Sequence, residues 1–204
     1  MSYSAVEPQE LAAVVTFLEM RQAPDQSPPP SPLALQPLPR DLGRYRALFA
    51  RVGAPWLWFS RLAMPDAELA AIIADPAVDL YAVVDPAGAE IGLLELDFRE
   101  AGQCELAFVG LVPEHAGRGH GRWLLAEALR LAWRGNGVRR VHVHTCTLDH
   151  PAALAAYRRA GFTAYRRAIE RFPDPRLLGL LPADCAPHIP LVGTPASTAS
   201  VPTS

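Results

Sequence analysis

The pattern of apolar and polar positions predicts strands and helices over most of the chain. Runs rich in β-branched and apolar residues predict strands, and helical spacing with marked ends predicts helices. The predicted strands are 13–20, 79–84, 90–98, 104–112, 138–147 and 162–172, the second and third forming a hairpin. The predicted helices are two short ones within 41–62, then 64–76, 121–134 and 151–160. This order predicts one α/β domain over residues 1–181.

Two segments lie outside this pattern. Residues 23–40 contain many prolines, three of them in succession at 28–30. Proline fixes the backbone and removes a hydrogen-bond donor, so this segment is predicted to be an extended loop. Residues 182–204 are rich in proline, serine, threonine and alanine, and we expect them to form a disordered tail.

Composition narrows the class of protein. Half of the 204 residues are hydrophobic and a fifth are charged, which is typical of a globular enzyme. The net charge of -2 gives no indication of nucleic-acid binding. No apolar run reaches the roughly 20 residues that span a bilayer, and the N-terminus lacks the features of a secretory signal. Three cysteines are too few for a disulfide framework. We therefore expect a protein of the reducing cytoplasm, without a membrane partner.

A glycine-rich loop joins a predicted strand to the helix at 121–134. Gly117, Gly119 and Gly121 alternate in it, so backbone N–H groups can approach an anion closely at the positive end of the helix. A Walker loop needs a lysine, and the chain contains none. A dinucleotide fingerprint would need a glycine where Arg122 stands. Both are disfavoured, and a plain tight turn stays as the alternative.

The sequence on either side of this loop resembles the signature of a known family. The run CELAFVGLVPEHAGRGHGRWLL, followed by DHPAALAAYRRAGF, resembles the signature of the GNAT superfamily of N-acetyltransferases over roughly residues 79–171. Ala116 departs from the Gln or Arg usual at the start of the loop. The resemblance implies a mixed, mostly antiparallel sheet flanked by helices, with strands splayed at a bulge, easily formed at Gly110, to admit coenzyme A. It also implies acetyl transfer from acetyl-CoA to an amine by direct attack, without a metal.

The resemblance implies roles for particular residues. Tyr157 corresponds to a general acid that protonates the departing thiolate, and packing of its ring is the alternative. Glu105 corresponds to the general base, with Glu95 and Asp97 as competitors. The residues that correspond to the coenzyme A site are Gly110, Leu111 and Val112 for the pantetheine arm, Gly117, Arg118, Gly119, His120, Gly121 and Arg122 for the pyrophosphate, and His150, which replaces an asparagine common there.

The acceptor is not identified by the sequence. His142, His144 and Cys146 alternate along one strand and share a face. Zinc binding by these three is disfavoured, because strand neighbours make a poor tetrahedral set, and lining of an acceptor pocket is the preferred reading. The aromatic run Trp56, Trp58 and Phe59 is a candidate wall of that pocket or part of the core. A non-catalytic acyl-CoA sensor, another donor such as succinyl-CoA, and a monomer or a homodimer all stay open.

Overall fold

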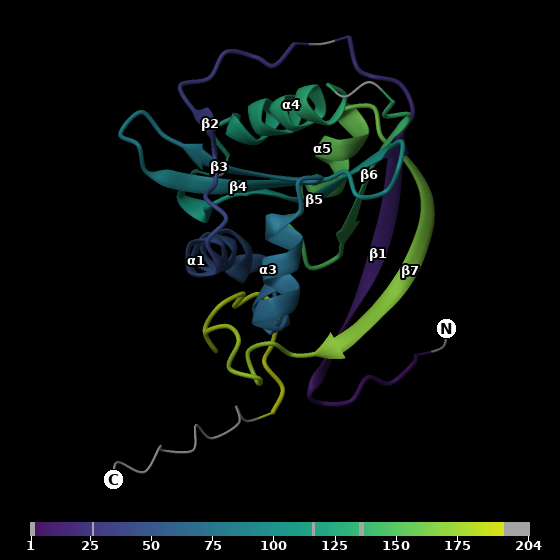
Figure 1. Ribbon diagram of the computed structural model, residues 1–204. Helices are drawn as coiled ribbons and strands as arrows, with labels where there is room; N and C mark the ends of the chain where they lie inside the picture. The colour runs from purple at the N-terminus through teal and green to yellow at the C-terminus, as the bar shows by residue number, and fades with distance from the viewer. Residues whose placement is uncertain (1–2, 26, 116, 135–136, 194–204) are drawn as a thin grey trace.

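The computed structural model describes residues 3–25, 27–115, 117–134 and 137–193. They form a seven-stranded sheet with helices on both faces (Figure 1). The strands are β1 (Glu10–Met20), β2 (Ala34–Pro37), β3 (Val78–Val84), β4 (Glu90–Asp97), β5 (Gln103–Leu111), β6 (Arg140–Cys146) and β7 (Thr163–Pro173). The α-helices are α1 (Leu42–Gly53), α2 (Ser60–Ala63), α3 (Asp66–Ala74), α4 (His120–Ala132) and α5 (Ala153–Arg159).

The sheet has the order β2-β3-β4-β5-β6-β1-β7. All neighbours are antiparallel except β5 and β6, which are parallel. The predicted mixed, mostly antiparallel sheet flanked by helices is therefore confirmed. The position of β1 was not predicted: the first strand of the chain lies between β6 and β7, and β7 forms the edge.

The helices cover the sheet in two layers. α4 and α5 lie on one face, and α1 and α3 lie on the other (Figure 1). In α1 the Asp41 side chain accepts a hydrogen bond from the Arg44 backbone N–H at 2.7 Å, which satisfies a free donor of the first turn. α1 buries Tyr45 and Phe49. α4 buries seven residues, Leu124 and Ala128 among them, which matches its predicted apolar stripe. Among the helices of the described residues, none is long and apolar enough to cross a membrane.

Two segments differ from the sequence prediction. The proline-rich loop contains the short strand β2, which pairs with β3 from the outer edge of the sheet, where a proline is tolerated. Residues 182–193, expected to be disordered, lie in turns against the domain. Ala186 is buried in a cluster with Leu57 and Leu181. Arg176, itself buried, donates a hydrogen bond to the Ile189 carbonyl at 2.9 Å. Residues 194–204 lie outside the described residues.

Candidate functional site

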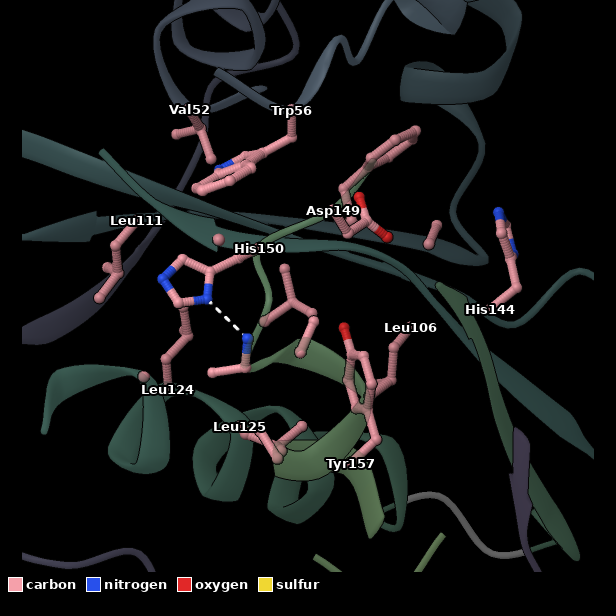
Figure 2. Close-up of a pocket in the computed structure, with 18 of the residues that line it drawn as sticks. Val52, Trp56, Leu106, Leu111, Leu124, Leu125, His144, Asp149, His150 and Tyr157 are labelled. Atoms are coloured by element: carbon pink, nitrogen blue, oxygen red, sulfur yellow. Dashed lines mark hydrogen bonds between the residues drawn. The ribbon is translucent and has the colours of Figure 1, made fainter. Parts of the chain in front are cut away.

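The parallel strands β5 and β6 diverge and leave an opening in the sheet. They pair only where residues 103–105 of β5 face residues 140–142 of β6. Beyond that point β5 stays paired to β4 as far as Leu111, and β6 stays paired to β1 as far as Cys146. A cavity of about 1280 Å³ occupies the opening, lined by α4 and α5 on one face and by the α1–α2 segment on the other. Figure 2 shows residues of both faces around it.

The bulge in β5 is at Ala107. The residues on either side of it pair with the consecutive residues Glu95 and Leu96 of β4, so Ala107 is the extra one. The prediction of a bulge at Gly110 is wrong. Gly110 stays in the ladder, and a Cβ there would lie 2.7 Å from Val52 Cγ1. This glycine therefore serves the close approach of α1 to the sheet.

The ladder also determines which backbone groups of β5 face the opening. The Val112 N–H donates to the Ile91 carbonyl at 2.9 Å. Residues of an antiparallel pair alternate between bonding their partner and pointing away from it. Gly110 therefore also points its backbone groups toward β4, whereas Val109 and Leu111 present theirs to the opening. Of the three residues expected at the pantetheine arm, Gly110 and Leu111 line the cavity, as does Val109, whereas Val112 is not among the described lining residues. Their role toward the arm stays a prediction, and the ladder favours the backbone groups of Val109 and Leu111 for it.

The glycine loop lies at the start of α4. Gly119 precedes the helix with φ +82°, and Gly117 has φ +75°. Both values lie in the left-handed region that side chains with a Cβ rarely adopt, so glycine is strongly favoured at both positions. Ala116 lies outside the described residues. Of the predicted loop residues, Gly117, Gly119, Gly121 and Arg122 line the cavity, whereas Arg118 and His120 are not among the described residues that line it.

Tyr157 lies on α5 and is largely buried. Figure 2 shows its hydroxyl directed into the cavity. Its ring packs edge-on against Phe162, with 5.8 Å between centroids. Burial, with a smaller contribution from Asp149, raises the pKa of the Tyr157 phenol. The hydroxyl is therefore protonated at neutral pH.

The turn between β6 and α5 brings Asp149 and His150 to the cavity. The Asp149 carboxylate accepts hydrogen bonds from Trp58 Nε1 at 3.1 Å, Thr145 Oγ1 at 2.6 Å and the Cys146 backbone N–H at 2.9 Å. His150 Nδ1 accepts from the Ala152 backbone N–H at 3.0 Å, which leaves Nε2 toward other partners (Figure 2). Asp149 was missed in the sequence. Its place in the sequence, an acidic residue in the short turn between a predicted strand and a predicted helix, is the signal that could have identified it.

Glu105 is joined to His144 across the opening. His144 Nδ1 lies 3.2 Å from Glu105 Oε1, and both side chains line the cavity. This hydrogen bond holds the pKa of Glu105 below its usual range and raises the pKa of His144. The His144 side chain is 51% exposed, so its ring is accessible from the cavity. Cys146 also lines the cavity, whereas His142 is not among the described lining residues.

The two competing carboxylates have arginine partners. Glu95 is fully buried and accepts hydrogen bonds from Tyr45 Oη and Arg61. It is not among the described residues that line the cavity, which leaves it unsuited to accept a proton there. Asp97 lines the cavity but is paired with Arg99. Burial raises the pKa of Asp97, but the hydrogen bonds and the positive charge of Arg99 together outweigh burial, so the pKa lies below its usual range. Among the described residues no group of three or more His, Cys, Asp or Glu is arranged to hold a metal ion.

The split between β5 and β6, the glycine loop and the cavity that joins them define a site that can hold an extended ligand carrying phosphates. A comparison with protein families shows the family. Residues 49–162 match the acetyltransferase (GNAT) family, so the chain belongs to this family. A comparison with curated proteins gave no match.

Solved structures show the same fold. A GCN5-related N-acetyltransferase from Sphaerobacter thermophilus is 21% identical with a TM-score of 0.53, and the match covers 79% of this chain and 51% of that one. This chain therefore spans about half the length of that protein. A spermidine N-acetyltransferase from Vibrio cholerae, in complex with CoA and spermine, is 23% identical with a TM-score of 0.54, covering 72% of this chain and 98% of that one. At these identities the likeness concerns the fold alone.

Proposed function

We propose that this protein transfers an acetyl group from acetyl-CoA to a primary amine. The observation that carries the proposal is the continuous cavity, which joins the glycine loop, the opening between β5 and β6, Tyr157 and the Glu105–His144 pair. A donor that enters at the loop on one face can meet an acceptor that enters from the other face.

The donor binds along the α4 side of the cavity. The backbone N–H groups at the start of α4 and in the glycine loop, those of Arg118 and His120 included, hold the pyrophosphate, and the Arg122 guanidinium adds charge. The pantetheine arm lies in the opening and pairs with the backbone of Val109 and Leu111, as an added strand would. His150 donates from Nε2 to the cofactor.

The reaction is a direct attack. A neutral amine attacks the thioester carbonyl, the new C–N bond forms and the C–S bond breaks. The base role expected for Glu105 is proposed here for its partner: His144, held by Glu105, accepts the proton that the amine loses, because the raised pKa of His144 makes it the stronger base of the two. Tyr157 gives its proton to the leaving thiolate and regains one from solvent. The products are an N-acetyl amide and coenzyme A with a free thiol.

Acetyl-CoA binding by calorimetry, together with thiol release in the presence of an amine panel, tests this function. Tyr157→Phe is expected to lower kcat by roughly 10²- to 10⁴-fold, the usual contribution of general acid–base catalysis, and to leave the Kd for acetyl-CoA unchanged. Tyr165→Phe is the matched control, because Tyr165 lies on β7 and is 49% exposed. Unchanged kcat in Tyr157→Phe would remove the acid role.

The same experiments separate the alternatives. Absence of acetyl-CoA binding would reject the proposed function altogether. Binding without thiol release for any amine would instead favour an acyl-CoA sensor. A comparison of acetyl-CoA with succinyl-CoA as donor tests the acyl group.

A further inference from the structure

The part of the cavity on the α1–α2 face, here named the acceptor half, is walled by aromatic rings. Phe59 and Phe172 are stacked with 4.8 Å between ring centroids and an interplanar angle of 26°. Trp58 and Phe108 lie 5.3 Å apart in a tilted arrangement. Five aromatic side chains line the cavity from this face: Trp56, Trp58, Phe59, Phe108 and Phe172.

These rings are not all enclosed by the protein core. Phe59, in the segment between Trp58 and α2, is only half-buried, and so are Trp56 and Trp58. Trp58 is held in place by its hydrogen bond to Asp149, so this wall is fixed before any ligand arrives. Half-buried apolar rings along a cavity favour an apolar, planar ligand, because binding removes the surface of the rings and the surface of the ligand from water.

The charges of the acceptor half select for a cation. Its two lining arginines are neutralised by carboxylates, Arg61 by Glu95 and Arg99 by Asp97. Glu105 lines the cavity beside His144. Glu170, on β7, lines the same half and has no arginine partner among the described residues. A positively charged group is therefore attracted before it loses a proton, and an aromatic face adds to this attraction.

We propose that the acceptor half binds a primary amine carried on an aromatic body, an arylalkylamine. The ring of such an acceptor lies against the Phe59–Phe172 pair, and its amine is directed to the Glu105–His144 pair. A linear polyamine fits less well, because its several charges need several carboxylates in a row and its chain gains little from aromatic walls. This inference rests on the proposed function and gives it a class of acceptor.

The first experiment compares amines with the full chain and acetyl-CoA, following thiol release. Phenylethylamine, cyclohexylethylamine, butylamine and spermidine are the probes. The highest kcat/KM is expected for phenylethylamine. An equal or higher kcat/KM for spermidine or butylamine, or no reaction with phenylethylamine while acetyl-CoA binds, overturns the aromatic acceptor. Failure to bind acetyl-CoA rejects the proposed function instead, so the two failures are distinguishable.

The second experiment removes one ring. Phe59→Leu is expected to raise the KM for phenylethylamine roughly two- to tenfold, the contribution of one aromatic contact, without changing the Kd for acetyl-CoA. Tyr165→Leu removes an aromatic ring from the exposed part of β7 and is expected to leave both values unchanged. An unchanged KM in a folded Phe59→Leu protein contradicts the placement of the ring. Equal changes for phenylethylamine and butylamine contradict it as well.

Discussion

Replacement of Arg176 by methionine tests whether the segment after β7 is a firm part of the domain. The Arg176 and Asp174 side chains are 1% and 3% exposed. Arg176 Nη2 lies 2.7 Å from Asp174 Oδ2 and Nε lies 3.0 Å from Oδ1, so the pair is bidentate. The same guanidinium donates to the Ile189 carbonyl, which ties the segment down. Methionine fills a similar volume but leaves the Asp174 charge buried without its partner.

The expected effect follows from that burial. Removal of one partner from a buried ion pair destabilises a protein by about 3–5 kcal/mol, because the remaining charge is uncompensated. For a chain of 150–250 residues, each kcal/mol lowers Tm by about 2–4 °C. Arg176→Met should therefore lower Tm by about 6–20 °C. The double variant Asp174→Leu with Arg176→Met should regain most of this loss, since it leaves no buried charge.

Thermal unfolding followed by circular dichroism measures these shifts. Arg171→Met is the matched control, because Arg171 forms an exposed pair with Glu10 in which the side chains are 47% and 32% exposed. Exposed pairs contribute about 0–1 kcal/mol, so its Tm should change by at most about 4 °C. If Arg176→Met and Arg171→Met shifted Tm equally, or if the double variant were no more stable than Arg176→Met, the reasoning from burial would be refuted.

Two further predictions concern the site. Gly110→Ala should lower the free energy of unfolding by about 1–3 kcal/mol in urea, because its Cβ would lie 2.7 Å from Val52 Cγ1. The control Gly121→Ala, whose Cβ would lie in open space, should change stability far less. Equal losses in the two variants would contradict the steric argument. The value of kcat/KM should rise as the pH passes through the raised pKa of His144, since only the neutral imidazole accepts a proton. Glu105→Gln should move that rise to lower pH, because it removes the charge that stabilises the imidazolium. A rise at the same pH in Glu105→Gln would contradict the role of the Glu105–His144 pair.

Local pattern was enough to predict most elements of the fold, but not the place of β1. Residues 13–20 show the apolar composition of a strand, and the structure confirms that strand. Its partners are more than a hundred residues away, at Val141–Cys146 and Thr163–Pro173. The sequence of a strand does not by itself determine which strands it pairs with, because pairing depends on side chains that the rest of the chain supplies.

The prediction of disorder for residues 182–193 was wrong for a related reason. Their composition is typical of disordered segments, but the few residues that hold them to the domain, such as Ala186, contact residues that are distant in the sequence.

Within the site, the sequence predicted features that depend on local backbone conformation. The positive φ values of Gly117 and Gly119 confirm that these glycines occupy positions of a tight turn, whereas binding of an anion by the loop stays a prediction. The sequence did not predict which side chains pair with each carboxylate. Glu95 and Glu105 look alike as strand residues, yet one is enclosed by Tyr45 and Arg61 and the other faces His144. Only the long-range packing of α1 and α2 on β4 distinguishes them.

The opening between β5 and β6 persists because each strand is paired to another strand on its other side. β4 pairs with β5 as far as Leu111, and β1 pairs with β6 from Val141 to Cys146. The backbone groups that face the opening therefore lack a strand partner but remain in contact with a cavity that water can enter, so the penalty for leaving them unpaired is small. The hydrogen bond from Trp58 to Asp149 connects the α1–α2 segment to the turn after β6 and resists closure of the opening from that face.

An extended ligand that supplies the missing hydrogen bonds gains affinity without deforming the sheet, since the strands are already apart. The insertion of β1 beside β6 is thus a condition for the cavity, and variants that weaken the pairing of β1 with β6 should lose coenzyme A affinity before they lose the helices.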